Sequence, residues 1–154
     1  MELINSNIEV KSVSIITPSY NSVKYIGKTI DSVLSQTYRN WEMIVVDDVS
    51  LDNSNDIVEK YCKKDSRIKL IKLEQNSGAA VARNRAIKEA KGRYIAFLDA
   101  DDIWKAEKLE KQIYFMQKNN YSFTYTAYEK IDENGVVFGK IEVPLKVSYN
   151  QLLK

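Results

Sequence analysis

The stretch Tyr94-Ile95-Ala96-Phe97-Leu98-Asp99-Ala100-Asp101-Asp102 decides the fold class of this chain, because a run of apolar residues ends abruptly in three carboxylates. Such a run is typical of a strand buried on both faces, in the middle of a mainly parallel sheet. In open α/β sheets, ligands bind outside the carboxyl ends of the strands. The carboxylates therefore lie where a site is expected, and an Asp-x-Asp pair there can bind a hard divalent cation.

A helix cap is the alternative explanation for part of this triplet. Asp is a favoured N-cap residue, and Asp101 or Asp102 could begin the helix that the residues from Glu107 to Met116 predict. One cap needs one carboxylate, whereas three adjacent carboxylates repel one another unless a cation offsets their charge. Both explanations stay open for Asp102, and the triplet as a whole favours a cation.

The composition of the chain limits the chemistry that it can perform. Its 154 residues, 44% hydrophobic and 29% charged, are typical of one globular domain with a core of its own. A net charge of +2 is too small to indicate a nucleic-acid partner. Histidine is absent and Cys62 is the single cysteine, which excludes Ser-His-Asp and Cys-His hydrolases, His-rich zinc sites and Cys-x-x-Cys centres. Any metal must bind mainly to oxygen.

Strands and helices alternate along the first three quarters of the chain. Strands are predicted at four apolar runs: 13–17, 41–46, 68–73 and 94–98. The third run alternates and is expected nearer an edge of the sheet. Apolar residues at helical spacing predict four helices, around 26–34, 57–62, 79–90 and 107–116. This order predicts a doubly wound α/β fold, with a mainly parallel sheet flanked by helices.

Proline and glycine refine these boundaries, and the pattern changes near the end of the chain. Pro18 should stop the first strand, and Gly92 is expected in a left-handed conformation after the third helix. Residues 122–128 are strand-like, Asp132-Glu133-Asn134-Gly135 is a strong turn signal, and a further strand begins at Val136. We therefore expect an appended β-hairpin.

The ends of the chain carry less pattern. Residues 1–11 are expected to be a flexible lead-in, and residues 148–153 resemble the start of a helix. We take residues 12–154 as one domain that is incomplete at its C-terminus, and expect the chain to be part of a larger protein.

Polar groups follow three of the predicted strands and should meet at one edge of the sheet. They are Thr17-Pro18-Ser19-Tyr20-Asn21, Asp47-Asp48 and Asp99-Ala100-Asp101, with Arg83-Asn84 one turn into the third helix. Together they offer carboxylates for a base or ribose, a cation site for a diphosphate, and an arginine for phosphate charge. Singly, Arg83 could be a surface ion-pair residue, and Asp47 and Asp48 could be loop residues.

Four segments of the chain, in this order, resemble glycosyltransferase family 2. They are SIITPSYN at 14–21, IVVDDVSLD at 44–52, NSG with ARN between 76 and 84, and FLDADD at 97–102. The segment LSQTY at 34–38 is also similar to the family's usual sequence, and the resemblance covers roughly residues 12–130. One departure is Val49, which replaces a glycine common at that position and affects the shape of the loop.

The resemblance implies a GT-A (Rossmann-like) fold that binds a nucleotide-diphosphate sugar, with a UDP-sugar expected. It implies transfer of the sugar, with inversion and dependence on a metal, to a glycan or lipid-linked acceptor in surface polysaccharide biosynthesis. Thr17, Pro18 and Tyr20 would pack on the base of the nucleotide. Asp48 would accept a hydrogen bond from the uracil ring nitrogen.

The same resemblance assigns the phosphate side of the site. Asp99 would approach the ribose, and Asp101 would hold Mn²⁺ or Mg²⁺ between the two phosphates. Ala100 lies between them in the donor-binding segment, and Arg83 would contact the donor. The cation would act as a Lewis acid that stabilises the departing nucleoside diphosphate.

The catalytic base is not identified. Inverting members of the family use a carboxylate well downstream of the metal motif, so the base is expected beyond Lys154; Asp132 and Glu133 lie in a turn signal that explains them.

Two alternative functions fit the sequence less well. A sugar-phosphate nucleotidyltransferase would need a glycine-rich loop directly after the first strand, where this chain has Pro18-Ser19-Tyr20-Asn21. A receiver-like domain would need its acidic pair after the first strand, whereas Asp47-Asp48 follows the second. A nucleotide-binding fragment without catalysis stays open.

The sequence also bears on location. No segment approaches the roughly 18 apolar residues of a membrane span, and the first residues lack the pattern of a secretory signal. We expect a cytoplasmic protein, brought to the inner face of a membrane if its acceptor is lipid-linked. The oligomeric state cannot be read from the sequence.

Overall fold

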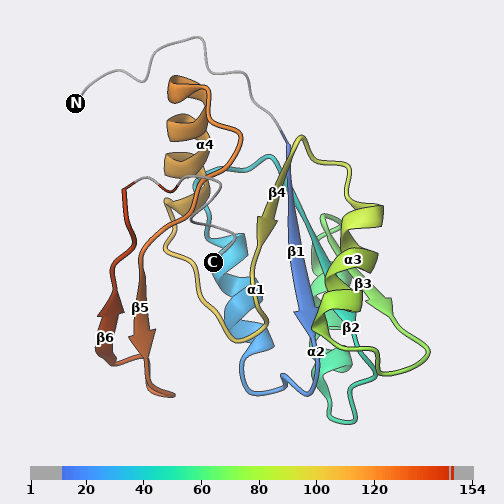
Figure 1. The fold of residues 1–154 in the computed structure, drawn as a ribbon. Coiled ribbons are helices and arrows are strands. Elements are labelled where there is room, and N and C mark those ends of the chain that lie inside the picture. The colour runs from blue at the N-terminus through green and yellow to red at the C-terminus, as the bar shows by residue number, and fades with distance from the viewer. Residues whose placement is uncertain (1–11, 146, 148–154) are drawn as a thin grey trace.

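A computed structural model describes residues 12–145 and 147 and contains an α/β unit and a separate hairpin (Figure 1). The expected lead-in at 1–11 and the helix start at 148–153 lie outside the described residues. Strands and helices of the α/β unit alternate as predicted: β1 (Val13–Ser19), α1 (Ile26–Leu34), β2 (Trp41–Asp47), α2 (Ser54–Lys64), β3 (Ile68–Lys72), α3 (Ala79–Glu89), β4 (Tyr94–Phe97) and α4 (Lys108–Asn119).

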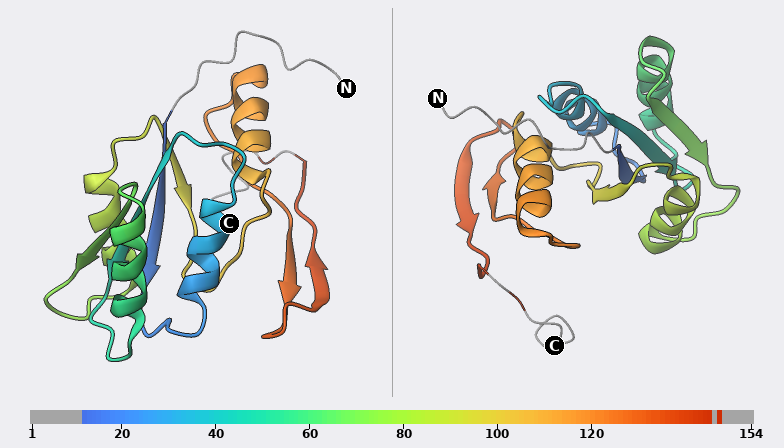
Figure 2. Two further views of the ribbon diagram at one scale, coloured as in Figure 1. Left: turned by 180° about the vertical axis from the view of Figure 1, so that it is seen from behind. Right: turned by 90° about the horizontal axis from the view of Figure 1, so that it is seen from above.

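The four strands form one parallel sheet in the order β3-β2-β1-β4. Helices α1 and α2 cover one face and α3 covers the other, as the right-hand view of Figure 2 shows. Each face has its own buried apolar cluster, the larger one on the α1 side. The predicted fold class is confirmed, and β3 lies at an edge as its alternating sequence indicates. None of the described helices is long and apolar enough to cross a membrane.

The position predicted for β4 is wrong, because this strand lies at an edge of the sheet formed by the described residues. Ile95 and Phe97 are 40% and 56% exposed. Phe97 is opposite Ile16, whose side chain belongs to the α3-side cluster. Since α3 packs over β1 and β2, it leaves this face of β4 open. An apolar run indicates a strand with two apolar faces and does not reveal how many strands pair with it.

Pro18 and Gly92 also differ from expectation. Pro18 lies inside β1, opposite Val46. Residues 16 and 18 turn their backbone toward β4, which ends at Phe97, so the missing N–H of Pro18 removes no ladder hydrogen bond. Gly92 has no left-handed conformation. Its Cβ would lie 2.4 Å from the backbone nitrogen of Ser14, so glycine is needed there for a close approach of two chain segments.

The appended hairpin is confirmed, with different strand bounds. Its strands are β5 (Tyr128–Ile131) and β6 (Val137–Ile141), paired antiparallel. Residues 122–127 form no strand, although their sequence is strand-like. The Asp132 carboxylate accepts hydrogen bonds from the backbone amides of Asn134 and Val136, at 2.9 and 2.8 Å, and so closes the predicted turn.

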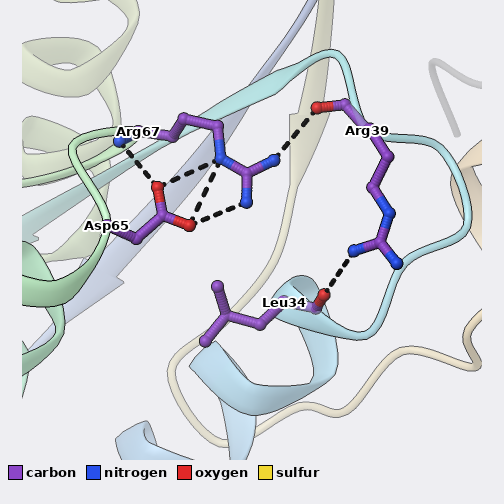
Figure 3. A network of polar contacts seen from close by, with 4 residues as sticks. All are labelled: Leu34, Arg39, Asp65 and Arg67. Carbon is purple, nitrogen blue, oxygen red and sulfur yellow. Dashed lines mark hydrogen bonds and ion pairs between the residues drawn. The ribbon is translucent and has the colours of Figure 1, made fainter.

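A network of two arginines links the segments that precede β2 and β3 to the end of α1 (Figure 3). The Arg67 guanidinium binds the Asp65 carboxylate at 2.7 Å and lowers the pKa of that carboxyl. Arg67 also donates to the carbonyl of Arg39 at 3.0 Å, and Arg39 donates to the carbonyl of Leu34 at 3.1 Å. The turn before β3 is thereby tied to the end of α1.

Val49, directly after Asp48, has a φ of 64°, a conformation that is unfavourable for a β-branched residue. Substitution Val49→Asn or Val49→Gly should therefore raise the free energy of unfolding by about 1 kcal/mol, since asparagine and glycine adopt this conformation readily. Urea denaturation would measure the change. Leu51→Asn, in the same loop at an exposed residue without positive φ, is the control and should have no such effect. A Val49→Asn protein no more stable than wild type would contradict the prediction.

Lys108, in the first turn of α4, has its pKa lowered to about 8 by burial. Its ammonium lies 4.3 Å from the centre of the Trp104 ring. Between pH 8 and pH 10 the unfolded chain binds more protons than the folded one at this residue, so its contribution to stability increases as the pH rises. We expect the free energy of unfolding of wild type, relative to Lys108→Met, to rise by about 2 kcal/mol over this range. Denaturation of both proteins at the two pH values tests this; a constant difference would disprove it.

Candidate functional site

A cavity of about 320 Å³ lies at the carboxyl ends of β1 and β2 and at the segment after β4. Residues far apart in the sequence line it: Pro18, Ser19, Tyr20, Asn21, Ser22, Tyr25, Asp48, Ala79, Arg83, Asp99, Ala100 and Asp101. It brings together seven of the eight residues to which the family resemblance assigns a role in binding the donor or the metal. The exception is Thr17, which is fully buried and does not line the cavity. Its predicted contact with a base therefore cannot come from an exposed side chain.

Aromatic rings form one side of this cavity. Tyr20 and Tyr25 both line it and are 51% and 43% exposed. Tyr25, which precedes α1, belongs to no motif of the sequence and is a further residue of the site. The signal that could have found it is a second tyrosine in the same loop, because solvent-facing aromatic rings are common where planar ligands bind.

Backbone hydrogen bonds hold the loop that carries these rings. The amides of Asn21, Ser22 and Val23 donate to side chains of the loop between β2 and α2 and of the first residue of α2, at 2.9, 2.9 and 3.0 Å. Their acceptors are Ser50, Ser54 and Asp52. The Asn21 side chain accepts from the Leu51 amide at 2.8 Å in return. These hydrogen bonds join the loop after β1 to residues 50–54, so that the two segments form one connected wall.

The two aspartates that end β2 have different surroundings. Asp47, the last residue of β2, accepts from the Ser50 amide in the loop that follows and from the Asn55 side chain on α2, at 3.0 Å each. Asp48 is buried but lines the cavity, and its two carboxylate oxygens accept from the amides of Ser77 and Gly78 at 2.7 Å each. The loop explanation therefore holds for Asp47, while Asp48 fixes the start of α3.

Arg83 and Asp99 form an ion pair at 2.6 Å at the edge of the cavity. Their side chains are 35% and 49% exposed, so water competes with the pair and it contributes little to stability. A second cavity of about 320 Å³, lined by Arg83, Phe97, Asp99 and Asp102, lies on the other side of it. The pair is a shared wall of both cavities, and its guanidinium can reach a ligand in either.

Along the Asp-Ala-Asp segment, the two Asp side chains are accessible to solvent and the Ala side chain between them is buried. Ala100 is 7% exposed and belongs to the α1-side core, while Thr29 donates to its carbonyl at 2.8 Å. Asp101 is exposed beside it. Burial, together with the charges of Asp101 and Asp99, raises the pKa of Asp102.

The helix-cap explanation for Asp101 and Asp102 is wrong. Helix α4 begins at Lys108, with Glu107 at the N-cap position and no side-chain cap. Five residues separate Asp102 from this helix start. The two aspartates lie in the irregular segment between β4 and α4 and cap no helix there.

The donor set is compatible with a cation shared with a ligand. Among the described residues, no group of three or more His, Cys, Asp or Glu side chains could enclose a metal ion. The carboxylates of Asp99, Asp101 and Asp102 supply oxygen only, and Asp99 is paired with Arg83. Mg²⁺ and similar ions often bind through one or two carboxylates and complete their shell with substrate phosphates and water. The residues present fit that mode.

Comparison with known proteins shows the family and the fold of this chain. A family model described as glycosyl transferase family 2 matches residues 14–152. The chain is 50% identical to a putative teichuronic acid biosynthesis glycosyltransferase, TuaG, of Bacillus subtilis, over 92% of this chain and 57% of that protein. It is 56% identical to the Escherichia coli protein WfgD, named a UDP-Glc:alpha-D-GlcNAc-diphosphoundecaprenol beta-1,3-glucosyltransferase, over 92% of this chain and 55% of that protein. The chain spans about half the length of these curated relatives.

Solved structures share the fold. Staphylococcus aureus TarS, residues 1–349 in complex with UDP, matches with a TM-score of 0.67 and 38% identity over 71% of this chain and 33% of that chain. The mannosyltransferase PcManGT from Pyrobaculum calidifontis, in complex with GDP-Man and Mn²⁺, matches with a TM-score of 0.65 and 27% identity over 69% of this chain and 32% of that chain. The predicted GT-A fold is confirmed, and this chain belongs to glycosyltransferase family 2.

Proposed function

We propose that this chain is the donor-binding part of a glycosyltransferase that transfers a sugar, with inversion, from a UDP-sugar to a glycan or lipid-linked acceptor in surface polysaccharide biosynthesis. The observation that carries the proposal is the convergence of Asp48, Arg83, Asp99 and Asp101 on one cavity with two tyrosine rings. Carboxylates, a guanidinium and aromatic faces are the groups that recognise a ribose, a diphosphate and a base, respectively.

The nucleoside end of the donor lies, in this proposal, between the tyrosine loop and Asp48. Each oxygen of the Asp48 carboxylate already accepts one backbone amide and can accept a second hydrogen bond, here from the uracil ring N–H. Pro18 and Tyr20 would pack on the base. The choice of a uridine nucleotide is supported by TarS, which was solved with UDP and with UDP-GlcNAc, and by a relative named for UDP-Glc.

The diphosphate end would lie between Asp101 and Arg83. Asp101 offers an oxygen ligand to Mn²⁺ or Mg²⁺, and PcManGT was solved with Mn²⁺ and a nucleotide sugar. When bound, the cation acts as a Lewis acid toward the departing diphosphate. Arg83 adds positive charge once a phosphate replaces Asp99 as its partner, and Asp99 is then available to the ribose.

The acceptor side needs residues outside this cavity. The carboxylates that line it, those of Asp48, Asp99 and Asp101, all have donor-side roles in the proposal. Asp132 closes the hairpin turn, and neither it nor Glu133 lines the cavity. We propose that the base lies beyond Lys154. The lipid-linked acceptor in the name of one relative supports action in the cytoplasm at the inner face of a membrane.

Removing the carboxylate of Asp101 should abolish the part of UDP affinity that depends on a cation. Calorimetric titration of UDP into the 154-residue chain, with Mn²⁺ and with chelator, measures that part for wild type and Asp101→Ala. Asp56→Ala, an exposed aspartate on α2 outside the cavity, is the matched control and should behave as wild type. Tighter binding with Mn²⁺ that persists in Asp101→Ala would contradict the assignment of the metal to this residue.

Asp48→Asn should weaken UDP binding equally with Mn²⁺ and with chelator. The substitution replaces one carboxylate oxygen with an NH₂ group, which cannot accept hydrogen bonds, so a single oxygen is left for the base and the two loop amides. Hydrogen bonds to charged groups are worth about 1.5–3 kcal/mol, or roughly tenfold to a hundredfold in affinity. The same titrations measure the loss. A loss confined to the Mn²⁺ condition would refute the placement of the base at Asp48.

A further inference from the structure

Three buried polar residues lie on one side of α1 and just beyond its end. They are Thr29 and Ser32 within the helix and Gln36 two residues after it, and none is more than 6% exposed. Spacings of three and four residues place them along one face. Polar side chains are seldom so completely buried unless they have hydrogen-bond partners. We call them the α1 polar stripe.

Each residue of the stripe has a carbonyl partner on α1 or just before it and also binds backbone between Ala100 and Leu109. Thr29 Oγ1 donates to the carbonyl of Ala100 at 2.8 Å, and Ser32 Oγ accepts from the Trp104 amide at 3.2 Å. Gln36 uses both ends of its amide: Nε2 donates to the carbonyl of Lys105 at 2.9 Å, and Oε1 accepts from the amide of Leu109 at 3.1 Å. The stripe therefore follows the backbone from the carboxylate triplet to the first turn of α4.

The segment needs these partners because it has no regular structure of its own. Residues 98–107, between β4 and α4, form neither helix nor strand, and buried backbone groups without partners are costly. Its connection to α4 runs along α1 (Figure 1). The Ala100 side chain is in the core while its carbonyl is bound to Thr29. The position of the neighbouring carboxylates is thus set by α1.

We propose that the α1 polar stripe positions Asp101 for the divalent cation, with Thr29 as the positioning residue closest to the metal ligand. The inference rests on the proposed function, since it concerns the same cation site. A cation shared with a diphosphate needs its carboxylate ligand at a fixed place, and a hydrogen bond one residue away limits how that carboxylate can move. The stripe residues do not line the cavity themselves.

Thr29→Val tests the inference, because valine keeps the shape of the side chain and removes the hydroxyl. The readout is the ratio of UDP affinity with Mn²⁺ to UDP affinity with chelator, measured on the 154-residue chain. We expect this ratio to fall roughly threefold to tenfold, the effect of one lost hydrogen bond, while affinity with chelator is unchanged. Thr29→Ser keeps the hydroxyl and should restore the wild-type ratio.

A structural role alone would lower the melting temperature of Thr29→Val and leave the affinity ratio at the wild-type value; that result would overturn the inference. If Thr29→Val does not fold, Ser32→Ala replaces it, with the same expected fall and the same overturning result. A wild-type protein that binds UDP equally with Mn²⁺ and with chelator would instead refute the cation site of the proposed function. Failure of the positioning role and failure of the site are therefore distinguishable.

Discussion

Strand β1 is hydrogen-bonded on both sides, to β2 and to β4, in parallel registers that bring Ser19 opposite Asp47 and Ile16 opposite Phe97. Because the strands are parallel, their carboxyl ends all lie at the same end of the sheet. The first residues after each strand therefore lie near one another, whatever their separation in sequence. Tyr20, Asp48 and Asp99 meet at one cavity for this reason.

Convergence alone would leave three loose loops, and side chains bound to backbone groups make them rigid. Ser50, Asp52 and Ser54 hold the tyrosine loop, Asp48 holds the start of α3, and the α1 polar stripe holds the carboxylate segment. In each case a polar side chain is the hydrogen-bond partner of backbone groups that, in a helix or strand, would bond to other backbone groups. The donor site proposed above would benefit from walls that are fixed before the ligand arrives, because less ordering is then needed on binding.

Some aspartates near the site bind groups of the protein itself, and others line the cavity or are exposed to solvent. Asp47 and Asp52 are occupied by loop backbone, and Asp48 both anchors a loop and lines the cavity. Asp99 faces Arg83, and Asp101 is exposed. Three carboxylates follow β4, and the pKa of the last, Asp102, is raised first by burial and then by the charges of Asp101 and Asp99. Such a cluster is unfavourable in an empty protein, and a bound cation would offset the cost.

The sequence by itself determined the alternation of strands and helices, the parallel sheet, the appended hairpin and the strand ends that carry the site, because periodicity and strand-end chemistry are local properties. It could not determine that β4 lies at an edge or that Thr17 is buried, nor that Gly92 is needed for contact with Ser14. It also left unassigned Tyr25 and the partners of Thr29, Ser32 and Gln36. Those features depend on which segments pack together across the fold, and only the tertiary structure decides such long-range contacts.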